Sequence, residues 1–266
     1  MFDPYKRRID YLRISVTDRC NLACDYCAPE GAAAKVEHAA ILSFEEIADF
    51  TARGAELGIR KVRLTGGEPL LRRDLPMLVS MLSAIPGISD LAMTTNGILL
   101  PGSAAALKAA GLKRINVSLD AVDPARFRKL THGGDVHAVF RGLEAALAAG
   151  LSPVKVNCVV QEGPDEPDAA AVRAWCQSRG LEPRFIKRMD LKEGRFSVVQ
   201  GGSGGDCGRC SRLRLTSTGL LKPCLFSDLA FDIRALGHRE ALLLAVARKP
   251  ERGAPGATHS FHQIGG

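Results

Sequence analysis

The sequence predicts an α/β fold, a partial (βα)6 barrel of the TIM type followed by a small C-terminal region. Short β-like runs alternate six times with helical patterns between residues 11 and 188. The runs are rich in Val, Ile and Leu, as is typical of parallel strands that are covered on both faces. Six such units with right-handed crossovers are too few to close an eight-stranded barrel. We therefore expect a curved parallel sheet with one open side.

Each unit of the predicted barrel has its own signals. Helices are expected at 43–57, 74–84, 103–110, 123–130, 135–149 and 167–179. Ser43 and Glu46 form a capping-box pattern at the first of these helices, and Asp120 and Asp123 offer caps before the fourth. The strands are expected at Tyr11–Val16, Lys61–Thr65, Leu91–Thr95, Arg114–Leu119, Val154–Val160 and Pro183–Arg188.

The pattern changes after Met189, which predicts two regions, 1–189 and 190–266. Residues 190–206 contain five glycines and have no helical period, and a segment with three cysteines follows them. A helix is expected near 239–248. The stretch 252–266 is rich in Gly, Pro and His and reads as a disordered end.

Charge and composition narrow the class of partner. The 266 residues carry a net charge of +7, but the Lys and Arg residues are scattered and only 5% of residues are aromatic. A nucleic-acid surface usually shows a clustered basic stripe with stacking aromatics, so we expect a small anion in a pocket and no nucleic acid. No apolar run is long enough to span a bilayer, and the first ten residues do not resemble a secretory signal. These features predict a cytoplasmic protein without a membrane partner.

Eight cysteines in such a chain are expected to be thiols, metal ligands or catalytic groups rather than disulfides. Cys158 and Cys176 stand alone and are expected to be small buried hydrophobes. The other six fall in two groups, which are Cys20, Cys24 and Cys27, then Cys207, Cys210 and Cys224.

The first group follows the first predicted strand with the spacing C-x3-C-x2-C. Three thiolates on a four-iron cluster leave one iron open for a chelating ligand. A zinc site is the alternative, but it calls for a fourth Cys or His at regular spacing, and His38 lies eleven residues beyond Cys27. The loop resembles the signature of the radical S-adenosylmethionine (SAM) superfamily, in which the open iron binds SAM. Tyr26 occupies the position at which that superfamily carries an aromatic residue.

Polar residues at the ends of the other strands support this resemblance. Thr65-Gly-Gly-Glu-Pro69 ends the second predicted strand and resembles the superfamily element that holds the amino group of SAM. Each of these positions taken singly could equally be a solvated loop. By resemblance, the SAM site comprises Tyr26, Gly67, Glu68, Thr95, Asn96, Ser118, Lys155 and Met189.

The second group has the spacing C-x2-C-x13-C, and two arginines lie between its second and third cysteines. An incomplete zinc ribbon is one interpretation, and a second four-iron cluster with an open iron is the other. In an extended segment Arg212 and Arg214 share one face. Their forked donors suit a phosphate group, although exposed strand charges are the simpler alternative.

Taken together, these motifs resemble one family, the GTP 3′,8-cyclases that begin molybdenum cofactor biosynthesis. The resemblance rests on 12–20, 61–69, 114–120, 184–186, the C-x2-C-x-R-x-R stretch and the final Gly265-Gly266. It implies two [4Fe–4S] clusters, SAM, catalytic roles for the first cysteines and for Arg212 and Arg214, and GTP bound between the clusters. The substrate residues it implies are Arg13, Lys61, Arg63, Arg184, Arg212 and Arg214.

The resemblance also implies an electron donor, hand-off of product to a cyclic pyranopterin synthase, a homodimer, and a terminal Gly-Gly that is needed for product formation. The sequence departs from the family pattern at two places near the expected substrate site. Lys187-Arg188 stands where the family has Glu, and the stretch between Met189 and Cys207 is several tens of residues shorter than usual. The alternatives are a radical SAM enzyme that acts on another nucleotide or a peptide, and a non-catalytic metal-stabilised binding module.

Overall fold

The computed structural model of the chain describes residues 1–27, 36–190, 192–202 and 204–255. Six β–α units occupy the first part of the chain, as predicted. The strands are β1 (Tyr11–Ser15), β2 (Lys61–Thr65), β3 (Asp90–Thr95), β4 (Arg114–Ser118), β5 (Val154–Val160) and β6 (Glu182–Lys187). The helices are α1 (Phe44–Glu56), α2 (Leu75–Ser83), α3 (Ala104–Ala109), α4 (Pro124–Thr131), α5 (Val136–Ala148) and α6 (Pro167–Gln177).

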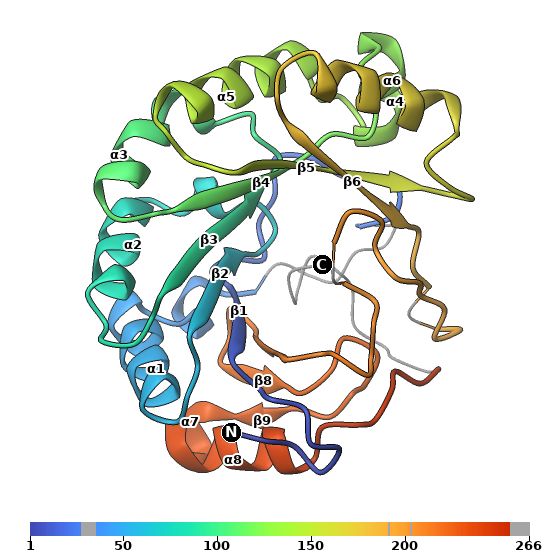
Figure 1. Ribbon diagram of the computed structural model, residues 1–266. Helices are drawn as coiled ribbons and strands as arrows, with labels where there is room; N and C mark the ends of the chain where they lie inside the picture. The colour runs from blue at the N-terminus through green and yellow to red at the C-terminus, as the bar shows by residue number, and fades with distance from the viewer. Residues whose placement is uncertain (28–35, 191, 203, 256–266) are drawn as a thin grey trace.

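The six strands form a curved parallel sheet in the order β6-β5-β4-β3-β2-β1. Figure 1 shows α1, α2, α3, α5 and α6 along the outer face of this sheet, while the segment that follows β6 lies on the open side. The partial barrel with an open side is therefore confirmed. Because all six strands run in the same direction, their carboxyl ends and the loops that follow them gather at one rim.

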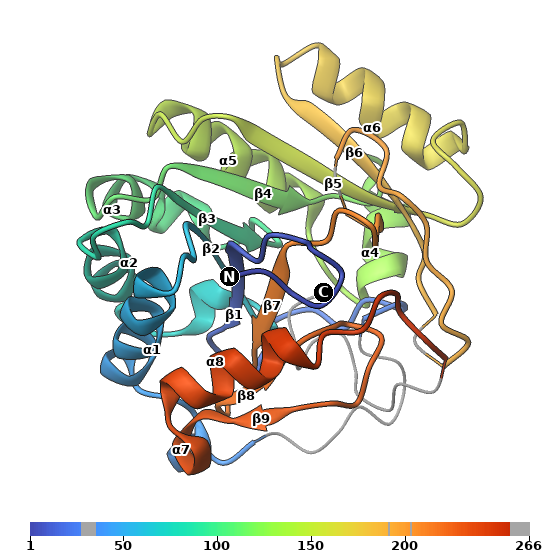
Figure 2. The same ribbon diagram turned by 60° about the horizontal axis from the view of Figure 1, so that its bottom comes forward.

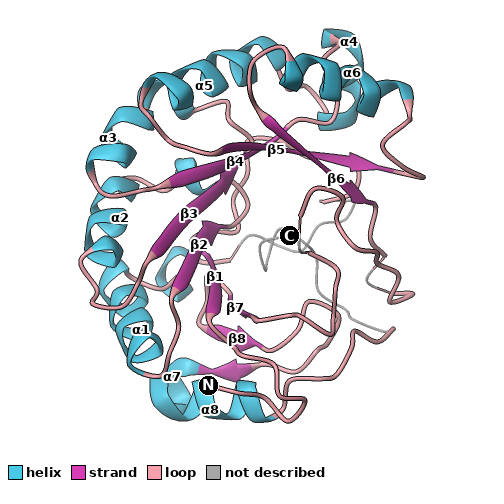
Figure 3. Ribbon diagram, in the orientation of Figure 1, coloured by secondary structure: helices cyan, strands magenta, loops and turns pink. Residues whose placement is uncertain are grey.

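The C-terminal region extends the same sheet. A short strand that the sequence did not predict, β7 (Arg212–Leu215), pairs in parallel with β1, with Tyr11 opposite Arg212 and Arg13 opposite Arg214. The antiparallel strands β8 (Leu220–Lys222) and β9 (Phe231–Asp232) follow it, as Figure 3 shows at the edge beyond β1. The helices of this region are α7 (Ile233–Leu236) and α8 (His238–Ala247), the latter at the predicted place.

The main hydrophobic core lies between the sheet and its outer helices. It includes fully buried side chains from the strands and from α1, α2 and α5, among them Ile14, Leu64, Phe50 and Leu78. Cys158 and Cys176 are fully buried, which confirms that they are small core residues. None of the helices in the described part of the chain combines the length and the apolar character that a membrane span requires.

Local sequence signals set the helix starts, with one correction. Ser43 and Glu46 form the predicted capping box on α1, and the Asp123 side chain accepts a hydrogen bond from the Arg126 amide at the start of α4. Asp120 is not a cap. Its buried carboxylate accepts hydrogen bonds from the Tyr26 hydroxyl and the Val159 amide instead.

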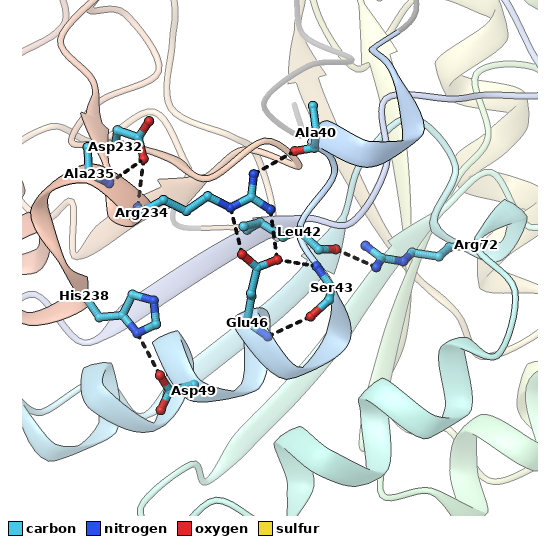
Figure 4. A network of polar contacts seen from close by, with 10 residues as sticks. All are labelled: Ala40, Leu42, Ser43, Glu46, Asp49, Arg72, Asp232, Arg234, Ala235 and His238. Carbon is cyan, nitrogen blue, oxygen red and sulfur yellow. Dashed lines mark hydrogen bonds and ion pairs between the residues drawn. The ribbon is translucent and has the colours of Figure 1, made fainter.

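Polar contacts connect the C-terminal helices to α1, which Figure 2 shows next to α8. The Arg234 guanidinium donates to both carboxylate oxygens of Glu46 at 2.7 and 2.9 Å, and His238 Nδ1 lies 3.0 Å from the Asp49 carboxylate. Figure 4 shows that Glu46 also accepts from the Ser43 amide, so one carboxylate serves the capping box and the ion pair together.

Glu46→Gln is expected to lower the free energy of unfolding by about 0.5–1 kcal/mol, because the pair is partly exposed and water screens it. The hydrogen bond from Arg234 lowers the pKa of Glu46. A carboxylate with a lowered pKa stabilises the fold above its unfolded pKa, so the difference from wild type should be present at pH 7 and vanish below about pH 4. Urea denaturation at both pH values measures it. Glu144→Gln on the exposed face of α5 is the control, and an equal loss there would contradict the role of the pair.

Candidate functional site

The first cysteine group lies in the loop directly after β1. Cys20 is exposed, whereas Cys24 and Cys27 are half-buried. The Leu22 amide donates to the Cys20 Sγ at 3.4 Å, and the Cys27 amide donates to the Cys24 carbonyl at 2.9 Å. These bonds give the loop a turned conformation that brings its three thiols to the carboxyl rim of the sheet.

The donor set of this loop fits a cationic centre. Burial raises the pKa of all three thiols, to about 12 for Cys27, and the Asp120 carboxylate is the next cause for Cys24. Thiolates at this place therefore need a nearby positive charge, which iron ions would supply. Within the described ranges, no three His, Cys, Asp or Glu side chains converge closely enough to hold a single metal ion. A four-iron cluster takes each thiolate on a different iron, so its ligands lie further apart.

The turn after β2 packs directly on the cysteine loop. The Gly67 amide donates to the Thr17 carbonyl at 2.8 Å, and the Glu68 amide donates to the Arg19 carbonyl at 2.7 Å. A Cβ on Gly67 would lie 2.2 Å from the Arg19 carbonyl oxygen, which no real side chain tolerates. The absence of a side chain at Gly67 therefore allows close approach of the loop that carries Cys20.

Gly67→Ala is expected to displace the cysteine loop and to reduce iron incorporation several-fold, because backbone on both sides of the contact leaves the methyl group no space. Iron and sulfide assays after anaerobic reconstitution provide the measurement. Gly163→Ala is the matched control, since a Cβ there meets nothing within 4 Å. Normal iron content in the Gly67 variant would show that the loop does not depend on this contact.

Glu68 connects the ends of β2 and β3. Its fully buried carboxylate accepts hydrogen bonds from the Leu70 amide at 2.9 Å, the Thr95 hydroxyl at 2.7 Å and the Asn96 amide at 2.7 Å. Burial raises the pKa of Glu68, and these bonds oppose the rise. The Asn96 side chain in turn donates to Asn21 Oδ1 at 2.7 Å, so the network reaches the cysteine loop.

The remaining predicted SAM residues come from β4, β5, the segment after β6 and the loop after β1. Ser118 is the half-buried last residue of β4. Lys155, near the start of β5, forms an ion pair of 3.1 Å with Glu182. Met189 packs with Leu225 and Phe226 in a second, small hydrophobic cluster. Tyr26 lies against these strands through its 2.8 Å hydrogen bond to Asp120.

A cavity inside the barrel brings together most of the predicted substrate residues. It is lined by five of the six predicted basic residues and by all three cysteines of the second group, namely Arg13, Arg63, Arg184, Arg212, Arg214, Cys207, Cys210 and Cys224. Met189, Asn116, Asn157 and Tyr11 also line it. Lys61 does not. Its exposed ammonium lies 3.4 Å from the Asp10 carboxylate.

The cavity has a strongly positive interior. Burial alone would raise the pKa of Tyr11, yet Arg63, Arg13 and Arg212 together lower it. Burial and then Arg212 lower the pKa of Arg214 to about 10. The buried Nε atoms of Arg63 and Arg184 have no hydrogen-bond partner within the described residues. Buried cations with unused donors are the arrangement that binds a polyanion.

The second cysteine group has a lysine that sequence reasoning missed. The Lys249 ammonium is buried and donates to the carbonyls of Arg212 and Pro223. Burial would raise the pKa of Cys210, but Lys249 and then Arg212 outweigh it and lower that pKa. A single lysine in a Lys-Pro pair carries no sequence signal, since its role arises only from its burial next to these thiols.

Arg7 holds this region together from the N-terminal side. Its guanidinium pairs with Asp3 at 2.6 Å and donates to the carbonyls of Cys207 at 2.8 Å and Pro250 at 2.7 Å. The predicted Gly265-Gly266 tail lies outside the described residues.

Comparison with known proteins gives consistent results. The sequence pattern of the Radical SAM superfamily matches residues 14–176. The GTP 3′,8-cyclase of Pelotomaculum thermopropionicum is 40% identical over 95% of this chain and 94% of its own length. That of Alkaliphilus oremlandii is 38% identical over the same shares. Both alignments, of 307 and 300 positions, exceed the 266 residues of the chain, so the relatives have residues without a counterpart here.

Among solved structures, native anSMEcpe with bound AdoMet is similar in fold, with a TM-score of 0.63 and 15% identity over 91% of this chain and 81% of that one.

Proposed function

The chain belongs to the GTP 3′,8-cyclase family of the radical SAM superfamily, and from this premise we propose that it converts GTP to its 3′,8-cyclised form in the first step of molybdenum cofactor biosynthesis. The observation that carries the proposal is a cavity lined by five arginines, of which Arg63 and Arg214 are buried, together with the second cysteine group. The arginines bind the triphosphate, and Cys207, Cys210 and Cys224 bind a second cluster.

A reduced [4Fe–4S] cluster together with SAM would supply the radical chemistry that abstracts a hydrogen atom from the substrate. Cys20, Cys24 and Cys27 would hold that cluster. Glu68 orients Thr95 and Asn96 at the adjacent rim through its three hydrogen bonds. Together with Tyr26, Gly67, Ser118, Lys155 and Met189, these residues form the proposed SAM site.

The arginines bind and orient the nucleotide. Guanidiniums that line the cavity lose part of their hydration on folding, and a triphosphate offers them charge-assisted hydrogen bonds. Arg63 and Arg184 have buried Nε donors available for this purpose. Arg212 and Arg214 lie on β7 close to the second cysteines, so they place the phosphates at that end of the cavity. The Lys249 ammonium counters the negative charge of the thiolates there.

The proposal includes the remaining features of the family. Residues 1–189 form the barrel and 190–266 the region of the second cluster, joined through the β1–β7 pairing. An electron donor reduces the SAM cluster, the product passes to a cyclic pyranopterin synthase, and the protein acts as a cytoplasmic homodimer. Lys61 contributes to phosphate binding only if its exposed side chain moves from Asp10.

The test is anaerobic reconstitution with iron and sulfide, reduction, and incubation with SAM and GTP. We expect two clusters per chain, formation of 5′-deoxyadenosine, and a cyclised nucleotide whose formation requires GTP. ATP in place of GTP is the control. If SAM is cleaved but no nucleoside triphosphate binds below millimolar concentration, GTP is not the substrate.

A further inference from the structure

Two asparagines form a neutral polar pair within the cationic cavity. Asn116 lies on β4 and Asn157 on β5, and both side chains line the cavity. The Asn116 Nδ2 donates to the Asn157 Oδ1 at 3.4 Å. Asn116 is only 1% exposed, so its amide depends on partners inside the protein or in a ligand.

The Asn116 amide is incompletely satisfied. Its Oδ1 is buried and has no hydrogen-bond partner within the described residues. A buried acceptor that stays unpaired is costly, so the site favours a ligand group that donates a hydrogen bond. Ionised phosphate oxygens only accept, and therefore they cannot satisfy this atom. The pair is thus chemically matched to hydroxyl groups, which both donate and accept.

The position of the pair agrees with this chemistry. In the register of β4 and β5, Asn157 lies opposite Ser118 and Asn116 lies opposite Lys155, so the asparagines alternate with residues of the proposed SAM site. Arg184 lies opposite Asn157 on β6 and also lines the cavity. The asparagines therefore lie between the proposed SAM residues and Arg184, one of the arginines proposed to bind phosphate. In the proposed function, the ribose of the nucleotide lies at this place, next to the SAM site.

We propose that Asn116 and Asn157 bind the ribose hydroxyls of the substrate and select ribonucleotides over deoxyribonucleotides. This inference rests on the proposed nucleotide function and adds the residues that recognise the sugar. The Asn116 carbonyl oxygen accepts a hydrogen bond from one hydroxyl. The Asn157 amide, next to it, holds the Asn116 side chain in position and offers its own NH2 group to the sugar.

The test compares binding of GTP, 2′-deoxy-GTP and 3′-deoxy-GTP to reconstituted wild-type, Asn116→Ala and Asn157→Ala proteins. One neutral hydrogen bond corresponds to about a three- to tenfold change in affinity. Wild type should bind GTP more tightly than at least one deoxynucleotide by this factor. Each variant should lose affinity for GTP by a similar factor, while its affinity for that deoxynucleotide stays unchanged.

The possible results distinguish a failure of the asparagine inference from a failure of the proposed nucleotide function. If the wild type binds GTP but the variants keep its full preference for ribose, the asparagines do not read the sugar, and the proposed function stands. If the wild type cleaves SAM but binds no nucleoside triphosphate, the proposed function fails and this inference with it. Asn157 is only half-buried, so its variant tests the pair even if Asn116→Ala does not fold.

Discussion

Cys24→Ala is expected to abolish formation of 5′-deoxyadenosine and to remove about half of the bound iron. Cys24 is the central thiol of the three that follow β1, and two thiolates are not enough to retain a four-iron cluster beside an open iron. The second cysteine group is separate and should keep its own cluster. Iron analysis and single-turnover SAM cleavage under anaerobic conditions provide the two readouts.

Cys176→Ala is the matched control for this prediction. Cys176 is fully buried in α6 and belongs to neither cysteine group. Its loss should change stability slightly and leave both iron content and SAM cleavage intact. Undiminished SAM cleavage in the Cys24 variant would exclude the loop after β1 as the site of the SAM cluster.

Arg212→Ala and Arg214→Ala are each expected to weaken GTP binding roughly ten- to hundredfold. A hydrogen bond to a charged group contributes about 1.5–3 kcal/mol, which corresponds to this range. Both guanidiniums lie in the cavity beside the second cysteines. SAM binding should be unaffected. Isothermal titration with GTP and with SAM on the reconstituted protein separates the two effects.

Arg209→Ala provides a control for net charge. Arg209 lies between Cys207 and Cys210 but is exposed and does not line the cavity. Removing its charge changes the electrostatic field of the protein, which salt screens. It does not remove a buried group that donates a hydrogen bond to phosphate. A loss of GTP affinity equal to that of the Arg214 variant would show that general electrostatic attraction, and not a specific contact, accounts for the effect.

The sequence predicts most of the fold because the signals of the barrel are local. Strand β5 has apolar residues at five of its seven positions, and β4 has its apolar residues Ile115 and Val117 at alternate positions. The missed strand, β7, has only four residues, and two of them are arginines. Leu213 and Leu215 lie in the main core while the arginines line the cavity, so the strand lacks an apolar run such as that of β5. Its pairing with β1 is a tertiary property.

The difference between local sequence signals and tertiary contacts also decides which site residues could be predicted. The cysteine groups and the arginines of β7 can be recognised because their spacing within one short segment carries the chemistry. Lys249, Tyr11 and the asparagine pair could not be predicted, since each gains its role from neighbours that are distant in the sequence. Asp120 shows the converse error. It has the residue type of a helix cap, but the fold places Tyr26 next to it. The tyrosine hydroxyl donates its hydrogen bond to the Asp120 carboxylate.

The pairing of β7 with β1 has a consequence for how the length of the connector affects the protein. The first cysteine loop leaves the carboxyl end of β1, whereas Cys207 and Cys210 precede the amino end of β7, which pairs in parallel with β1, and Cys224 follows β8. The two cysteine groups therefore belong to opposite ends of neighbouring strands. Along paired strands the chain advances about 3.3 Å per residue, whatever segment joins the strands. The offset between the two cysteine groups is therefore set by the length of the paired strands, and the length of the connector 190–206 does not enter it.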